Sequence, residues 1–214
     1  MHPNPAFRTQ DEAEALATAR ARGFGVITLA GPGGPLAAHV PFVLDDGTAA
    51  GEARRLEAHL MRSNPIARAL RDGPLPALLI VSGPDGYVSP DWYGEADRVP
   101  TWNYVAVHLS GLLRLADTPM RDHLDRVSAA FESRLPKPAW TAAKMTPEVL
   151  ERMMRTILPV EMAIERVEST VKLNQNRTAS ARAGAIAAIE AGGTPGQETA
   201  ALAALMRGVA DDGS

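Results

Sequence analysis

The sequence contains no cysteine, which excludes disulfides, thiolate nucleophiles and cysteine-ligated zinc. It also lacks any apolar run approaching the roughly 18 residues of a membrane-spanning helix. Its first residues, MHPNPAFRTQ, bring prolines and charge in place of the apolar segment of a signal peptide. These absences predict a cytoplasmic protein that does not span a membrane.

An excess of positive charge is also missing. The chain has 214 residues with 22 basic and 25 acidic side chains, and its formal net charge is −3. No block of Lys or Arg forms the positive patch expected of a nucleic-acid groove, so direct DNA binding is disfavoured. An apolar content of 45% is ordinary for a globular protein of one large domain.

Common catalytic and metal motifs are absent as well. The five histidines show neither HExxH nor another short paired spacing, so no metal site is predicted. No serine lies in a GxSxG elbow. The GPGGP segment at 31–35 is not followed by Gly-Lys-Ser/Thr, which favours a hairpin turn over a phosphate loop.

Extended runs and helix signals alternate without the regular strand and helix repeat of a Rossmann fold. Strands are predicted at 24–30, 36–44, 53–61, 76–81, 101–116 and 159–173. Helices are predicted at 9–23, at 64–73, from 118, from 146, at 179–191 and at 197–209. Segment 53–61 fits both periods, and we favour a strand. This order predicts a mainly antiparallel β-barrel with peripheral helices, an α+β fold.

Aromatic residues are scarce, at 5% of the chain, yet half of them fall within residues 87–104. They are interleaved with prolines, hydroxyls and an amide, in the segment YVSPDWYGEADRVPTWNY. Planar faces next to directed donors suit a flat polar ligand, although a structural loop that covers one end of the barrel is an equal alternative. The candidate residues here are Ser89, Trp92, Tyr93, Thr101, Trp102, Asn103 and Tyr104.

Three further places offer hydrogen-bond donors. His108 shares one face of the 101–116 strand with Tyr104, while His39 lies in AAHVPF, where a structural role is the alternative. The segment KLNQNR at 172–177 concentrates two cations and three amides without an acid, which suits a phosphate or the edge of an electron-rich ring. Its candidates are Lys172, Gln175, Asn176 and Arg177.

Taken in order, the segments AAHVPF, RSNP, GPDGYVSPDWY, VPTWNYVAVH and KLNQNR resemble the PaiB family of FMN-binding negative transcriptional regulators. The resemblance runs from near the N-terminus to about residue 190. It implies a split β-barrel, as in flavoproteins similar to pyridoxamine phosphate oxidase, that forms a homodimer with FMN at the subunit interface. The expected domain spans 1–192, with a helical insertion at about 118–157 and a loosely attached helical tail at 193–214.

The resemblance also implies roles for the candidate residues. Aromatic side chains would shape the cleft: Trp92, Tyr93, Trp102 and Tyr104. Hydrogen bonds would come from His39, Ser89, Thr101 and Asn103. Lys172 and Arg177 would bind the phosphate, since a dianion normally needs a cationic side chain or several donors.

Function stays open among three alternatives at this point. The first is an FMN-binding regulator or sensor, and the second is a flavin-dependent oxidoreductase that uses NAD(P)H in the same cleft. The third is a repressor that binds DNA directly. Neither charge nor motif shows a DNA-reading helix, which favours indirect regulation.

Overall fold

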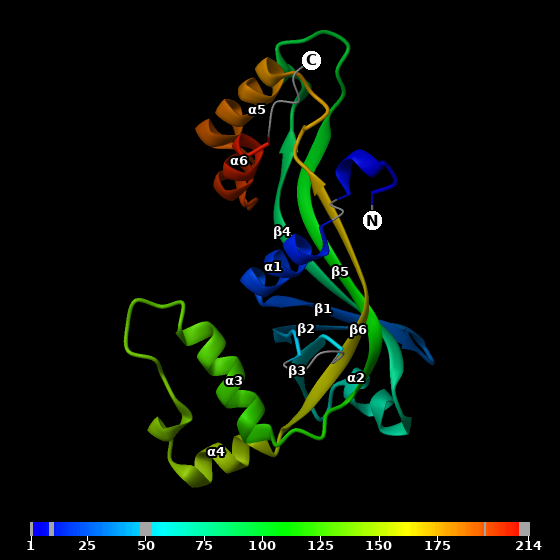
Figure 1. Ribbon diagram of the computed structural model, residues 1–214, viewed down its shortest axis with the longest axis vertical. Helices are drawn as coiled ribbons and strands as arrows, with labels where there is room; N and C mark the ends of the chain where they lie inside the picture. The colour runs from blue at the N-terminus through cyan, green and yellow to red at the C-terminus, as the bar shows by residue number, and fades with distance from the viewer. Residues whose placement is uncertain (1, 9–10, 48–52, 195, 210–214) are drawn as a thin grey trace. The chain divides into compact units, whose positions relative to one another are not determined.

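The computed structural model describes residues 2–8, 11–47, 53–194 and 196–209. Its strands form a closed antiparallel barrel in the order β1-β2-β3-β6-β5-β4 (Figure 1). They are β1 (Phe24–Gly31), β2 (Gly34–Asp45), β3 (Arg55–Met61), β4 (Leu75–Val88), β5 (Thr101–Leu115) and β6 (Ile157–Lys172). The predicted α+β barrel is confirmed, and all six predicted strands are present.

The helices lie in the connections between strands and at the two ends of the chain. They are the α-helices α1 (Glu12–Arg22), α2 (Pro65–Ala69), α3 (Met120–Glu132), α4 (Pro147–Met154), α5 (Ala179–Gly192) and α6 (Thr199–Arg207) and the 3-10 helices η1 (Pro5–Phe7), η2 (Leu70–Asp72), η3 (Pro90–Tyr93) and η4 (Ala142–Lys144). The chain divides into two compact units. The first comprises Met1–Thr18, Ser82–Val107 and Glu168–Ser214, and the second comprises Ala19–Val81 and His108–Val167.

Local capping signals place some of the helices correctly. Asn64 caps α2, because its side chain accepts a hydrogen bond from the Ile66 amide at 2.8 Å, with Pro65 at the first helical position. At Gly23 the backbone turns left-handed, with φ of 61°, and its amide bonds to the Ala19 carbonyl. This geometry favours glycine and ends α1 as predicted.

Two predicted helix starts are wrong. α1 begins at Glu12, because Asp11 Oδ1 accepts hydrogen bonds from the amides of Ala13 and Glu14 at 2.8 and 3.3 Å. The predicted cap, Thr9, lies outside the described residues. In α3, Pro119 stands at the cap position and the helix starts at Met120, so Thr118 lies one residue too early.

In the second unit, β5 and β6 approach each other very closely at Gly111. A Cβ at this position would lie 1.8 Å from the Ala163 carbonyl oxygen, which is backbone and has no rotamer to change. The buried face of β5 continues on both sides of this glycine with Leu109 and Leu113, each fully buried. Gly111 is therefore a packing requirement of the barrel.

A chain of titratable side chains connects α3 with β3 in the same unit. His59 Nδ1 and His123 Nε2 are 3.0 Å apart, and His123 Nδ1 lies 3.6 Å from the Glu57 carboxylate, which also accepts a hydrogen bond from Arg126 at 2.7 Å. His123 is almost completely buried. Burial lowers the pKa of His123 to about 4, with a further contribution from His59. The imidazole is therefore neutral in the native protein at pH 7.

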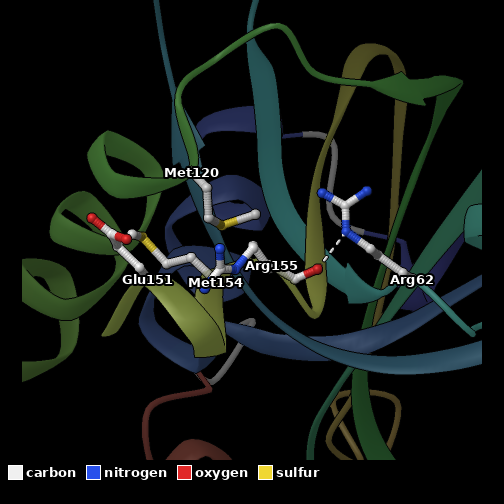
Figure 2. A pocket seen from close by; sticks show the side chains of 5 residues that line it. All are labelled: Arg62, Met120, Glu151, Met154 and Arg155. Atoms are coloured by element: carbon white, nitrogen blue, oxygen red, sulfur yellow. Dashed lines mark hydrogen bonds between the residues drawn. The ribbon is translucent and has the colours of Figure 1, made fainter. Parts of the chain in front are cut away.

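A small hollow of about 310 Å³ lies where α4 leads into β6 (Figure 2). Arg62 and Arg155 line it together with Met120, Glu151 and Met154. Arg62 Nε donates a hydrogen bond of 2.6 Å to the Arg155 carbonyl oxygen, which fixes the Arg62 guanidinium at the edge of the hollow.

In the first unit, β4 extends beyond the predicted end at Val81 and continues to Val88. The intervening GPDG has the composition of a turn. It remains extended because Gly83 packs against β5, where an added Cβ would lie 2.9 Å from the Cβ of Val105. Close packing between strands overrides the local turn signal here.

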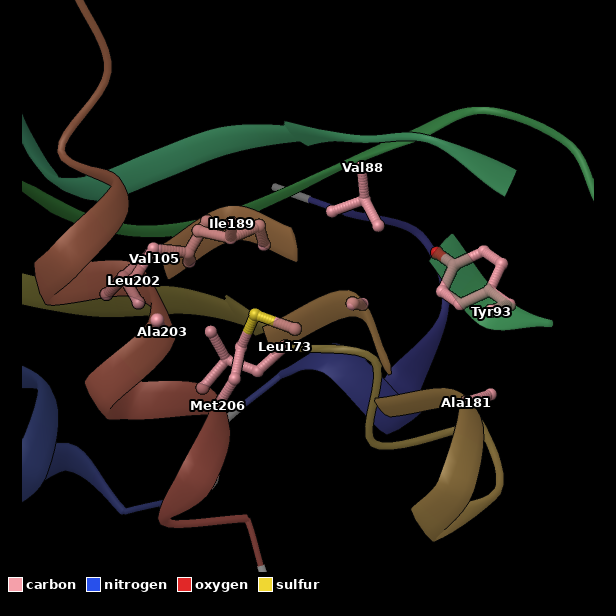
Figure 3. Close-up of a cluster of buried hydrophobic side chains, with 10 residues drawn as sticks. Val88, Tyr93, Val105, Leu173, Ala181, Ile189, Leu202, Ala203 and Met206 are labelled. Atoms are coloured by element: carbon pink, nitrogen blue, oxygen red, sulfur yellow. The ribbon is translucent and has the colours of Figure 1, made fainter. Parts of the chain in front are cut away.

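The prediction of a loosely attached tail is wrong. Leu202, Ala203 and Met206 of α6 are fully buried, in a cluster that includes Val88 and Val105 (Figure 3). α5 and α6 pack as a pair in this unit (Figure 1). The domain boundary predicted at residue 192 stays a prediction.

We expect Gly111→Ala to destabilise the protein by about 3 kcal/mol, since its methyl group would overlap a carbonyl oxygen in a packed barrel. Urea denaturation followed by circular dichroism measures this. Gly33→Ala is the matched control, because no atom lies within 4 Å of its added Cβ. Equal stability of the two variants would contradict this account of the strand contact.

Acid should weaken the native state through His123. Its folded pKa of about 4 lies below the value near 6.5 of an unfolded chain, so the unfolded state binds the extra proton. The free energy of unfolding should therefore fall as the pH drops from 6.5 to 4, by up to about 1.4 kcal/mol for each pH unit. Denaturation midpoints across this range measure the slope. His123→Gln should flatten it, and an unchanged slope would count against the buried neutral imidazole.

Candidate functional site

The aromatic residues of segment 87–104 meet around Tyr87. Its ring lies edge-on to Trp92 and to Trp102, with 6.3 Å between ring centroids in each pair. Edge-to-face contacts of this kind hold aromatic rings in fixed orientations. Trp102 keeps 49% of its surface exposed, so the cluster presents an indole ring at the surface.

The first residues of β5 alternate between two faces. Asn103 and Val105 point into the core of the first unit, whereas Trp102 is exposed and Tyr104 is half-buried. Asn103 is completely buried, and its amide Nδ2 donates to the Met206 sulfur at 3.5 Å, while its Oδ1 has no partner in the described chain. The period of two predicted from the sequence is confirmed.

Tyr93 is buried in the same core and joins the aromatic segment to KLNQNR. Its hydroxyl donates to Asn174 Oδ1 at 3.3 Å, and the Arg177 guanidinium lies 5.3 Å above its ring. Asn174 has a left-handed backbone, with φ of 60°, a conformation that asparagine tolerates better than most residues. Tyr93 therefore positions Arg177. Next to Tyr93, the Trp92 carbonyl packs against Gly184 of α5, where a side chain would not fit.

Lys172 ends β6 next to the start of β5. Its Nζ lies 2.5 Å from Thr101 Oγ1 and 5.7 Å from the centre of the Phe7 ring. Burial lowers the pKa of Lys172, and the positive charge of Arg177 lowers it further. Neither cation forms an ion pair with a carboxylate of the described chain. Two neighbouring cations that form no ion pair favour the binding of an anion.

Among the other polar candidates of the first unit, two side chains hydrogen-bond to the backbone and one is exposed to solvent. Ser89 Oγ accepts from the Asp91 amide at 3.4 Å and caps η3. Gln175 Nε2 donates to the carbonyls of Val171 and Ala6, at 2.6 and 3.1 Å, which secures the N-terminal segment. Asn176 is exposed.

His39 and His108 belong to the second unit. His39 is an exposed residue of β2, and its ring stacks on Phe24 with 6.2 Å between centroids. His108 is half-buried on β5. Their predicted contacts with a cofactor stay predictions, as do those of the other candidate residues.

Burial separates the candidates of the first unit into two groups. Thr101, Trp102, Lys172 and Arg177 are at least partly exposed, whereas the chain itself encloses Tyr93 and Asn103. The buried pair therefore belongs to the core beneath the candidate site, and the other four are accessible to a ligand. Sequence reasoning missed Phe7, Tyr87 and Asn174 as site residues. Tyr87 and Asn174 stand inside the motifs that drew attention, and no local signal marks Phe7.

The described residues contain neither a membrane-spanning helix nor a metal-binding cluster. None of the helices in the described ranges is both long and apolar enough to cross a membrane. Within the same ranges, no three His, Asp or Glu side chains gather where they could hold a metal ion.

Comparison with known proteins settles the family. Residues 1–166 match the family model described as "Putative FMN-binding domain". The chain belongs to this family. The match confirms the predicted PaiB resemblance and FMN as the cofactor, but it ends at residue 166, before KLNQNR. Beyond that residue, the assignment of Lys172 and Arg177 depends on their geometry.

Individual relatives agree with this result. The chain is 28% identical over 156 residues to the protease synthase and sporulation protein PAI 2 of Bacillus subtilis, which covers 72% of each chain. An uncharacterised protein of Emericella nidulans is 26% identical over 209 residues and covers 81% of this chain and 82% of its own.

Solved structures show the same fold at low sequence identity. The flavocytochrome Anf3 of Azotobacter vinelandii superimposes with a TM-score of 0.53 at 17% identity, covering 80% of this chain and 72% of its own. The FAD and heme binding protein of Mycobacterium smegmatis gives 0.52 at 19% identity, with 77% and 73% covered. The predicted split-barrel fold is thereby confirmed.

Tyr93→Phe should lower the free energy of unfolding by about 1 kcal/mol, since it removes the hydrogen bond to Asn174 Oδ1 and leaves a buried acceptor without a partner. Thermal denaturation measures the loss. The control is Tyr104→Phe, which removes the hydroxyl of a half-buried tyrosine of β5. Equal effects of the two substitutions would contradict the positioning role of Tyr93.

Proposed function

We propose that this protein binds FMN through the first unit and acts as a homodimeric flavin sensor that regulates transcription negatively without contacting DNA itself. The observation that carries the proposal is the pair formed by Lys172 and Arg177, two cations without a carboxylate partner next to aromatic faces. A phosphate and a planar ring system are the two parts of FMN, and this set of side chains fits both.

Each exposed side chain has a specific task in this proposal. Lys172 and Arg177 bind the phosphate, with the Thr101 hydroxyl as a further donor. Trp102 stacks on the ring system, held in orientation by Tyr87. The bound flavin would supply electron and hydride transfer. The chain contributes binding and electrostatics, since an anion on the two cations removes their mutual repulsion.

Glu95 lies near enough to Arg177 for the two charges to interact, but its hydrogen bonds go to other residues. Its carboxylate accepts hydrogen bonds from Thr178 at 2.7 Å and from Arg98 at 2.8 Å, and these bonds lower the pKa of Glu95. Both bonds keep the negative charge engaged beside the first residues of α5. No ion pair joins Glu95 to Lys172 or Arg177 in the described residues, so the donors of both cations can still bind a ligand.

Exposed apolar side chains support the homodimer in this proposal. In the second unit, Phe24 and Leu112 expose 48% and 44% of their surfaces. A second copy of the chain that covered these side chains would remove apolar surface from water. Sedimentation velocity at several concentrations tests this, and a monomer throughout would refute the dimer.

The two cations should discriminate FMN from riboflavin, which lacks the phosphate. Lys172→Gln and Arg177→Gln should each weaken FMN binding about tenfold, the value expected for one charge-assisted hydrogen bond. Riboflavin binding should hardly change. Trp102→Ala should weaken both ligands. Isothermal titration calorimetry measures the affinities, with Arg71→Gln as a control that removes one exposed cation from the second unit. Equal losses for FMN and riboflavin in the Lys172 variant would refute the phosphate assignment.

The regulatory proposal has its own test. We expect no shift of a promoter fragment at low salt, because the chain has a net negative charge and no block of cations. We also expect no rapid reduction of the bound flavin by NADH or NADPH without oxygen. A salt-sensitive, sequence-selective shift would establish a direct repressor, and rapid reduction would establish an oxidoreductase.

A further inference from the structure

The second unit contains a larger cavity that no part of the proposed flavin site uses. It lies among α3, α4 and the segment that joins them, next to the adjoining ends of β3 and β6, and its volume is about 570 Å³. Cavities of 300 to 1,000 Å³ are typical of small-molecule sites. All of its lining residues belong to the second unit, so the cavity is complete within one compact part of the chain.

The lining is mainly apolar and rich in methionine. Four of the eight methionines of the chain contribute to it: Met61, Met145, Met153 and Met154. Trp140 adds the one aromatic ring of the lining. Met61 and Met153 remain 52% and 55% exposed, which leaves apolar side chains open to a ligand. Methionine adapts to ligands of different shape, because it is unbranched and polarisable.

Hydrogen bonds fix the segment between α3 and α4 and therefore the position of Trp140. Glu132, the last residue of α3, accepts a hydrogen bond from the Trp140 amide at 2.8 Å. It also forms an ion pair with Lys137. The hydrogen bond from Lys137 contributes most to lowering the pKa of Glu132, and the bond from the Trp140 amide contributes next. The Met145 amide then bonds to the Ala142 carbonyl at 3.1 Å. The wall that carries Trp140 is thus organised before a ligand arrives.

Four polar side chains line the cavity. The Thr156 hydroxyl donates to the Met153 carbonyl at 2.6 Å, whereas the other three have no partner among the described residues. Arg152 is the one charged residue in the lining, and it pairs with no carboxylate in the part of the chain that the structure describes. The Ser128 hydroxyl and the Trp140 indole N–H likewise have no hydrogen-bond acceptor among the described residues. A cation and two donors around an apolar interior complement a ligand with one anionic end and an apolar body.

The surroundings keep the local charge positive. The hollow lined by Arg62 and Arg155 shares Met154 with the cavity (Figure 2). Glu151 is the one acid in that lining, against two arginines. In this adjoining hollow, arginines therefore outnumber acids by two to one.

We propose that this cavity binds a small amphipathic organic anion, with an apolar chain or ring against the methionines and Trp140 and a carboxylate or sulfonate at Arg152. The proposal does not depend on the flavin site, since it involves other residues in the other unit. It gives the protein a second ligand site, of the kind that a sensor uses to detect a metabolite.

The test uses the full chain, saturated with FMN, and the fluorescent probe 1-anilinonaphthalene-8-sulfonate, which joins aromatic rings to one sulfonate. We expect saturable binding of one probe per chain and displacement by decanoate. 1-Decanol, which has the same chain length without the charge, should displace the probe at least fivefold less effectively. A Trp92→Phe/Trp102→Phe variant leaves Trp140 as the one tryptophan, and its emission should fall as the probe binds.

Two substitutions locate the site. Arg152→Gln should weaken decanoate at least fivefold and leave decanol unchanged, while Arg68→Gln, at an exposed position on α2, should change neither. Ser128→Phe should block the cavity and abolish binding of the probe. Circular dichroism checks that each variant is folded, and the Arg152 result stands even if the Ser128 variant fails to fold.

Several results would overturn the proposal. They are absence of saturable binding, equal displacement by decanoate and decanol, no effect of Arg152→Gln, and an unchanged Trp140 emission. A self-association that is abolished by Met61→Glu and that excludes the probe would show that a second copy of the chain covers this face, which also refutes a ligand site.

Discussion

The hydrogen bond between Lys172 Nζ and Thr101 Oγ1 connects the end of β6 with the start of β5, and the candidate site depends on it. It places a cation of KLNQNR at the point where the aromatic segment enters the strand. Arg177 is held nearby by the ring of Tyr93, so both positive charges are fixed before any ligand binds. Burial lowers the pKa of Lys172, and the positive charge of Arg177 lowers it further. An anion would offset the repulsion between the two cations, which is why we propose a phosphorylated ligand for this site.

Beneath this site, the C-terminal helices supply the core that the strands alone do not have. The Met206 sulfur contacts the Asn103 amide, and the Gln197 side chain accepts a hydrogen bond from the Tyr87 amide at 2.9 Å. The chain after residue 192 therefore contacts two residues of the aromatic segment from the core side. The first unit thus combines a ligand-facing surface with an internal core formed by its own C-terminus, although the family match ends at residue 166.

Much of this fold follows from local patterns in the sequence. The alternation in 101–116 predicts which face of β5 is buried, because side chains alternate strictly along a strand. The Asn64-Pro65 pair predicts the start of α2, since the cap acts through its own neighbours. The KLNQNR segment, which contains no acid, indicates an anion site from local sequence as well. Its two cations are close in sequence and remain close in space.

Other features depend on contacts between distant residues and could not be predicted. The buried side of α6 faces Val88 and Val105, about 100 residues earlier in the chain. Tyr93 and Asn103 stand in motifs that suggest ligand contacts, yet packing against those C-terminal helices encloses them. GPDG has the local composition of a turn. The contact with Val105 that keeps it extended exists only in the folded sheet, so the sequence gives no sign of it. In each case the local preference is weak and tertiary packing decides.

The central claim is that Lys172 and Arg177 bind the phosphate of FMN. The most direct test is a crystal structure of the full chain in complex with FMN. The account predicts that the phosphate oxygens lie within hydrogen-bonding distance of Lys172 Nζ and the Arg177 guanidinium, with the ring system against Trp102. A complex in which the phosphate binds elsewhere, with both cations free, would contradict it.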